Sequence, residues 1–204
     1  MRLKFAVTFA ALLAGSSAAE SQKIVAQKAI SVVPAPVLLD NAGMFQERYA
    51  RVGDDMFIGG QPTERALRDL KAQGVTTVIN LRMPEEMARI GFDEQKLIAE
   101  LGMKYVHIPL RTGSSQENAY SPANLKRFSD AMQAADGKVL LHCTVAWRAS
   151  HIWAAYLIER GVADSAAVKH ARAINLMDDH RMDPSGKQPL EMFLGRTVQG
   201  LGRP

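Results

Sequence analysis

From Met56 onward the chain alternates short apolar runs with helical segments, and this order restricts the fold more than any other feature. Strands are predicted at 56–60, 75–82, 105–110 and 138–143. Helices are predicted at 63–74, within 84–102, at 121–137, from about 148 to 160, and over two shorter segments, 164–176 and 188–198. Such an alternation is typical of an α/β fold with a mostly parallel sheet flanked by helices.

Local signals support these boundaries. Thr63 and the Ser121-Pro122 pair stand where a helix begins, whereas Gly74 and Gly102 stand where one ends. The helix that starts near Arg148 is apolar on nearly every side, so it is expected to run through the middle of the fold.

The N-terminus has the pattern of a secretory signal peptide over residues 1–19. Arg2 and Lys4 precede an apolar run, and small residues end the stretch at Ala19. We therefore expect cleavage and export, to a bacterial periplasm or the exterior. No later window has the apolar length that a membrane span requires. The next segment, residues 20–50, contains two prolines and no sustained period, and is expected to be an extended arm over the surface.

Residues 51–204 have the length of one domain with its own core. The net charge of the 204-residue chain is +4, which falls to +2 without residues 1–19, and the basic residues are scattered. A nucleic-acid partner is therefore not expected. The pattern also calls for no metal or other cofactor, and it says nothing of the oligomeric state.

The segment HCTVAWRAS, residues 142–150, places the only cysteine of the chain between a strand and the apolar helix. The first N–H groups of a buried helix lack intrahelical partners and, with the helix dipole, favour an anion. The same field favours a thiolate at Cys143, and the guanidinium of Arg148 can hold two oxygens of a phosphate. Either this turn supports displacement at phosphorus or sulfur, or Cys143 merely packs in the core. The coincidence of thiol, short turn and arginine favours the first.

With FIGGQPTERALRDLKAQGVTTVINLR upstream and VHIPL between them, the turn resembles that of cysteine-dependent phosphatases, from about residue 55 to 176. It is most similar to the tyrosine/dual-specificity-phosphatase-like domains that some bacteria fuse to metallo-β-lactamase-fold hydrolases. The resemblance implies that Cys143 forms a phosphocysteine, that Arg148 holds the phosphoryl oxygens and that His142 tunes the thiolate. The phosphate-binding loop would also include Thr144, Val145, Ala146 and Trp147.

Three differences from this family pattern keep alternatives open. Four residues separate Cys143 from Arg148 where these phosphatases have five, and four is also the spacing of rhodanese-type sulfurtransferases. Ala146 stands where a glycine is usual, which makes the loop harder to form. Ala149 replaces the usual Ser or Thr, a hydroxyl that only Ser150 could supply. The interpretations are therefore a phosphatase that acts on a phosphorylated protein or small-molecule phosphomonoester, a sulfurtransferase, or a weakly active anion-binding pseudophosphatase.

The other candidate site residues lie outside this turn. Related phosphatases carry an aspartate general acid in the loop after the strand at 105–110, and the loop here offers only Glu117. A solvated loop carboxylate explains Glu117 equally well. Arg82 ends the strand at 75–82, where open α/β sheets bind ligands, so it either lines the pocket or makes a surface ion pair.

Overall fold

The computed structural model describes residues 33–111, 119–177 and 186–202. The predicted signal peptide, residues 1–19, and the candidate general acid Glu117 lie outside these ranges. Among the described helices, none combines the length and the hydropathy needed to cross a bilayer.

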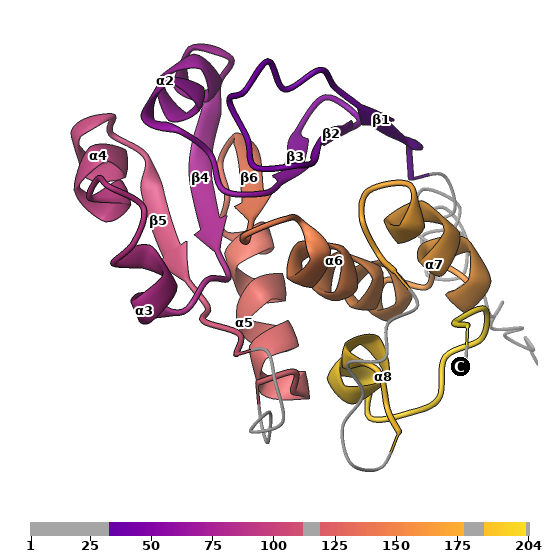
Figure 1. Ribbon diagram of the computed structural model, residues 1–204. Helices are drawn as coiled ribbons and strands as arrows, with labels where there is room; N and C mark the ends of the chain where they lie inside the picture. The colour runs from indigo at the N-terminus through magenta and orange to yellow at the C-terminus, as the bar shows by residue number, and fades with distance from the viewer. Residues whose placement is uncertain (1–32, 112–118, 178–185, 203–204) are drawn as a thin grey trace, which may run out of the picture. The chain divides into compact units, whose positions relative to one another are not determined.

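Within the described residues, six strands form one mixed sheet in the order β1-β2-β3-β6-β4-β5 (Figure 1). The strands are β1 (Pro36–Leu38), β2 (Tyr49–Val52), β3 (Met56–Gly59), β4 (Val75–Asn80), β5 (Lys104–His107) and β6 (Lys138–His142). Strands β3, β6, β4 and β5 run parallel to one another, whereas β2 pairs antiparallel with both β3 and β1 at one edge. The predicted mostly parallel α/β fold is confirmed.

The edge strands change one prediction. Residues 20–50 were expected to lie over the surface as an arm, but β1 and the first residues of β2 belong to the sheet. The pairing partner of this region is β3, through Tyr49↔Gly59 and Ala50↔Ile58. Strands of three and four residues are too short to show a period-two alternation of apolar residues, so the sequence of this region indicated only the prolines and no strand.

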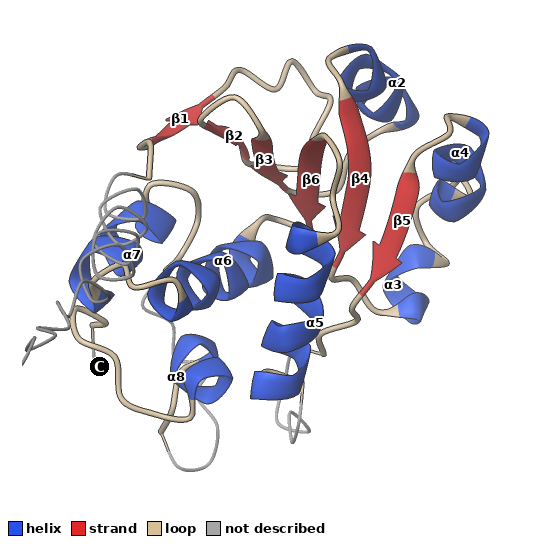
Figure 2. Cartoon of the chain, turned by 180° about the vertical axis from the view of Figure 1, so that it is seen from behind, coloured by secondary structure: helices blue, strands red, loops and turns tan. Residues whose placement is uncertain are grey.

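The helices follow the predicted order between the strands (Figure 2). They are α2 (Glu64–Ala72), α3 (Pro84–Met87), α4 (Glu94–Glu100), α5 (Pro122–Gln133), α6 (Trp147–Glu159), α7 (Asp164–Arg172) and α8 (Pro189–Leu194). Thr63 and Ser121 cap α2 and α5 by accepting a hydrogen bond from the backbone, as their positions in the sequence indicated. Gly91, with a φ of +78°, lies in the turn between α3 and α4.

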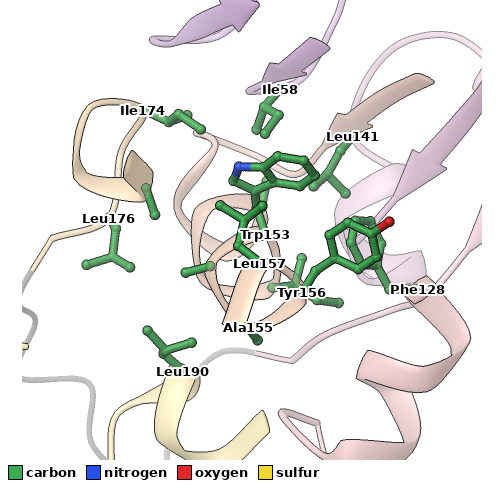
Figure 3. Close-up of a cluster of buried hydrophobic side chains, with 14 of the residues drawn as sticks. Ile58, Phe128, Leu141, Trp153, Ala155, Tyr156, Leu157, Ile174, Leu176 and Leu190 are labelled. Atoms are coloured by element: carbon green, nitrogen blue, oxygen red, sulfur yellow. The ribbon is translucent and has the colours of Figure 1, made fainter. Parts of the chain in front are cut away.

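Two apolar clusters cover the two faces of the sheet. Strand side chains alternate between them: Leu140 packs in the cluster of α2 and α4, and Leu141 packs in that of α5, α6, α7 and α8. In the second cluster, Trp153 and Leu157 of α6 lie near Ile58 and Leu141 of the sheet (Figure 3). Helix α6 is buried along almost its whole length, which confirms its expected central place.

Candidate active site

The turn after β6 is held by backbone contacts with the end of β3. His142 ends β6 and Trp147 begins α6, so four residues, 143–146, form the turn. The Cys143 N–H donates to the Gly59 carbonyl at 3.3 Å, and the Gln61 N–H donates to the Thr144 carbonyl at 2.9 Å. A Cβ on Gly60 would lie 1.9 Å from the Gln46 carbonyl oxygen and 2.7 Å from that of Thr144. Only glycine therefore allows these three backbone segments to meet.

Ala146 adopts the left-handed conformation, with φ +65° and ψ −1°, immediately before α6. This conformation costs an L-residue with a side chain about 1–2 kcal/mol, which is why glycine is favoured there. The turn forms despite the alanine, and Cys143, 1% exposed, lies at its start. The missing glycine thus adds strain to this turn without preventing it.

Arg148 is held by a carboxylate that the sequence had not singled out. Its Nη1 and Nη2 donate to Oε2 and Oε1 of Glu86 at 2.7 and 2.8 Å. Nη1 also donates to the Leu110 carbonyl at 2.9 Å, and Nη2 to the Thr144 hydroxyl at 2.8 Å. That hydroxyl donates in turn to Glu86 at 2.7 Å. We call Glu86, Thr144 and Arg148 the outer cluster.

These contacts fix the charges of the outer cluster. Burial by itself would raise the pKa of Glu86, but hydrogen bonds from Arg148 and the Met83 N–H outweigh it, and the pKa falls to about 2. Burial would likewise lower the pKa of Arg148, yet Glu86 and the neighbouring Cys143 hold it above its ordinary value. Within the described residues, the contacts of Arg148 use Nη1 and Nη2 and leave Nε available to an anion.

A second polar cluster is sealed beneath the turn. The carboxylate of Glu94, at the start of α4, accepts from Gln61 Nε2 at 2.6 Å and from Asn80 Nδ2 at 2.9 Å, and lies 3.1 Å from His142 Nε2. Burial would raise the pKa of Glu94, but His142 and the two amides hold it below its ordinary value. We call Gln61, Asn80, Glu94 and His142 the inner cluster. It joins the ends of β3, β4 and β6 to α4, directly behind Cys143.

Comparison with known proteins places this geometry in a family. Residues 49–158, more than half of the chain, match the phosphatase-like domain of the beta-lactamase hydrolase-like protein. The chain belongs to this family. No curated protein matches it. The resemblance to cysteine-dependent phosphatases seen in the sequence is thereby confirmed.

Two solved structures similar to this phosphatase-like chain, TpbA and PTPMT1, show the same fold. TpbA of P. aeruginosa superposes with a TM-score of 0.54 at 16% identity, over 82% of this chain and 93% of that one. PTPMT1 gives a TM-score of 0.50 at 22% identity, over 71% and 90%. The DUF442 protein of Shewanella putrefaciens CN-32 is 28% identical, over 66% of this chain and 74% of that one, with a TM-score of 0.44.

The phosphatase-like domain brings most of the predicted site residues together and gives two of them other surroundings. Thr144, Val145 and Ala146 form the turn with Cys143, and Arg148 lies in the first turn of α6. Ser150 does not face it: its hydroxyl donates to the Ala146 carbonyl at 2.8 Å and accepts from the Asn175 N–H at 3.1 Å. The hydroxyl that Ala149 lacks is therefore not replaced by Ser150.

Trp147 is 2% exposed and packs edge-on against Tyr120 and His151, so it supports the turn from within the core. His142 is buried, with its side chain directed to Glu94, and its Nδ1 has no hydrogen-bond partner among the described residues. Within the described part of the chain, the hydrogen bond of the His142 side chain goes to Glu94 and not to Cys143.

Arg82 is buried beside the outer cluster, so its ion pair with Glu86 is not the surface ion pair that was one interpretation of its position. It is 7% exposed, and its Nη1 donates to Gln61 Oε1 at 2.6 Å. Its Nε lies 3.9 Å from Glu86 Oε1. Burial lowers the pKa of Arg82, with Glu86 partly offsetting the effect.

Glu86 and Glu94 are the functional residues that sequence reasoning missed. Both stand in the first turn of a short helix, where an acidic residue is ordinary helix stabilisation. The place of Glu86 in the sequence could have identified it. Glu86 follows the strand that ends near Arg82, and the carboxyl ends of parallel strands meet at the sheet edge where Cys143 also lies.

Proposed function

We propose that this chain is a cysteine-dependent phosphatase that hydrolyses a phosphomonoester through a phosphocysteine intermediate. The observation that carries the proposal is the turn at 143–148, in which a left-handed residue, a buried helix start and the fork of Arg148 converge beside Cys143. Membership in a phosphatase-like family supports it.

The reaction would proceed in two displacements. The Cys143 thiolate attacks phosphorus, the bond from phosphorus to the ester oxygen breaks, and that oxygen takes a proton from a general acid, for which we propose Glu117. Water then displaces the thiolate from the phosphocysteine, which releases inorganic phosphate. The N–H groups of the turn and Arg148 stabilise the negative charge that grows on the phosphoryl oxygens in both steps.

We propose that Arg148 receives its substrate on the edge of the guanidinium that Glu86 leaves open. Glu86 holds one edge of the guanidinium, so the edge formed by Nε and Nη2 is the one that can meet a phosphoryl group. Nη2 is shared with the Thr144 hydroxyl, which can rotate away when a phosphate arrives. Glu86 thus positions Arg148 rather than competing for it.

A weakly active anion-binding protein is the second candidate. It is favoured by the position of Ser150, whose hydroxyl is already engaged by the Ala146 carbonyl and the Asn175 N–H and so is not free to assist breakdown of the phosphocysteine. Under this interpretation phosphate binds the turn but turnover is very slow.

Hydrolysis of p-nitrophenyl phosphate by the purified chain tests the proposal. Cys143→Ser should abolish turnover while phosphate still binds, since the site is built from backbone and Arg148. Arg148→Lys should lose most of what Arg148→Ala loses, on the order of 2–4 kcal/mol of transition-state stabilisation, because lysine lacks the planar fork. Arg160→Ala, on the same helix but at its far end, is the control.

Three outcomes separate the candidates. Hydrolysis that survives Cys143→Ser would contradict the mechanism. Phosphate binding without hydrolysis would favour the anion-binding protein. Thiocyanate formation from thiosulfate and cyanide, without phosphate release, would favour the sulfurtransferase chemistry that the four-residue turn also allows.

We also propose that the chain is exported to the periplasm or secreted after cleavage near Ala19. The support is the signal-like pattern of residues 1–19. Mass spectrometry of the N-terminus after expression in a bacterium tests it, and an uncut chain retained in the cytoplasm would contradict it.

A further inference from the structure

A hollow of about 680 Å³ opens between the N-terminus of α2 and the turn that follows α3. Its lining includes Gln61 and Arg82 from the ends of β3 and β4, Thr63 and Arg65 from the start of α2, and Arg89 from beyond α3. Parallel strands of an α/β sheet bind ligands at their carboxyl ends, and this hollow lies at that edge.

Positive charge dominates the lining. The lining contains Arg65, Arg82 and Arg89, and among the described residues that line the hollow only Glu64 is acidic. Arg89 is exposed, and its side chain makes no hydrogen bond or ion pair within the described residues. Arg65 approaches Asp69 only at 3.7 Å, with both side chains open to solvent, an arrangement that contributes little energy.

Arg82 places a buried charge at the base of this hollow. Its Nε has no hydrogen-bond partner among the described residues. The carboxylate of Glu86, 3.9 Å from that Nε, already accepts four hydrogen bonds from Arg148, Thr144 and the Met83 N–H. Arg82 therefore adds positive charge beneath the hollow, although its Nε is buried.

The hollow adjoins the Cys143 turn directly. Gln61 lines the hollow and its N–H donates to the Thr144 carbonyl, so one residue borders both sites. Arg82 and Arg148 both approach Oε1 of the same Glu86 carboxylate, at 3.9 and 2.8 Å. The first N–H groups of α2, next to Thr63, lack intrahelical partners and add to the positive field.

We propose that this hollow is a second anion subsite, which selects phosphomonoester substrates that carry a further carboxylate or phosphate group. The inference rests on the proposed phosphatase function and specifies its substrate class. Guanidinium groups suit both anions because each offers two parallel donors to a pair of oxygens. The second anion could belong to a peptide or to a small molecule, and matched substrates distinguish these sources.

Two substrate pairs test this, and within each pair the same ester oxygen leaves phosphorus. The first is a phosphotyrosine peptide flanked by glutamates against the same peptide flanked by glutamines. The second is glucose 1,6-bisphosphate against glucose 6-phosphate, measured by release of phosphate from the 6 position. In at least one pair we expect kcat/KM to be about tenfold higher for the substrate with the additional negative groups, mostly because its KM is lower.

The double variant Arg65→Gln/Arg89→Gln should lose this preference, so that the two members of the pair react at similar rates. The matched control is Arg51→Gln/Arg68→Gln, which removes two exposed arginines outside the hollow and the same total charge. The control should keep the preference. Absence of any preference in the wild type, or equal loss in both double variants, would overturn the proposal.

A titration with inorganic phosphate separates failure of the subsite from failure of the proposed function. Calorimetry of the wild type should show two binding events. Arg148→Ala should remove one, and Arg65→Gln/Arg89→Gln the other. A single event that depends on Arg148 alone would reject the subsite and leave the phosphatase proposal standing. A single event that depends on Arg65 and Arg89 alone would reject the phosphate-binding turn and support the subsite.

Discussion

The outer and inner clusters flank the same turn, yet they differ in how far solvent reaches the groups that hold it. In the outer cluster the Glu86 side chain is 27% exposed, and its partners, Arg148 and Thr144, border the place where a phosphate would bind. In the inner cluster the side chains of Glu94 and His142 are both 0% exposed, and their partners come from strand ends.

The difference separates a contact that can rearrange from one that cannot. Water or an anion can replace a hydrogen bond in the outer cluster at small cost. Opening the inner cluster would leave buried polar atoms without partners, which is expensive in free energy. We infer that the inner cluster fixes where the turn lies, while the outer cluster sets how Arg148 meets its ligand.

The largest expected effect comes from removing the inner carboxylate. Glu94→Ala should reduce the free energy of unfolding by about 3–5 kcal/mol, because His142 and two buried amides lose their acceptor. Glu86→Ala should cost less, about 2 kcal/mol, because the Glu86 side chain is partly exposed even though Arg148 is buried. Urea denaturation of both variants measures the two losses. Equal losses would erase the distinction between the clusters.

An intermediate effect is expected from acid. The pKa of Glu86 is lowered from 4.5 to about 2. The folded state therefore binds this proton less readily than the unfolded state, so the stability from Glu86 is complete above pH 4.5 and is lost as the pH falls towards 2. We expect this contribution to be on the order of 2 kcal/mol.

Glu86→Gln isolates that contribution. The variant cannot titrate at this position, so its stability should fall less than that of the wild type between pH 5 and pH 2.5, by about the same 2 kcal/mol. Glu94 and the other carboxyl groups titrate in both proteins and cancel in the comparison. Parallel unfolding curves against pH would show that the Glu86 contact with Arg148 does not persist in solution.

The smallest effect concerns the backbone between the clusters. Ala146→Gly relieves the positive φ, and should raise the free energy of unfolding by up to about 1 kcal/mol, as relief of strain outweighs the greater freedom of glycine when unfolded. Ala42→Gly, at an exposed φ of +45°, is the control for backbone strain alone. Thermal unfolding gives the stability of both variants. Only Ala146→Gly should also change the affinity for phosphate, and a lower stability would contradict the assignment of strain.

Most of the sheet and the buried helix could be predicted from sequence because each carries its own periodic signal. Strand β6 holds the apolar run 139–141, β4 combines Val and Ile with Thr, and α6 is apolar on nearly all sides. The place of Cys143 and Arg148 also followed from local order, since a turn between a strand and a helix fixes both residues.

The partners of that turn could not be predicted, because they depend on which strand ends lie side by side. Glu86 and Glu94 lie 62 and 54 residues before Arg148 and, in sequence, resemble any acid at a helix start. Only the strand order, with β6 between β3 and β4, brings them to Arg148 and His142. Ser150 failed as a candidate for a related reason: its backbone partner Asn175 comes from a distant segment.

The crowding at Gly60 bears on how much chain is needed to make a working domain. The family match begins at residue 49, but the Gln46 carbonyl closes on Gly60, the Gln46 N–H donates to the Gln61 carbonyl, and Phe45 stacks on Tyr49 at 4.0 Å. A shortened protein cut at the family boundary would lose the contacts of Phe45 and Gln46 with the end of β3, next to the Cys143 turn. Expression for crystallography or screening should therefore keep the chain from β1 onward, since β1 pairs in the same sheet.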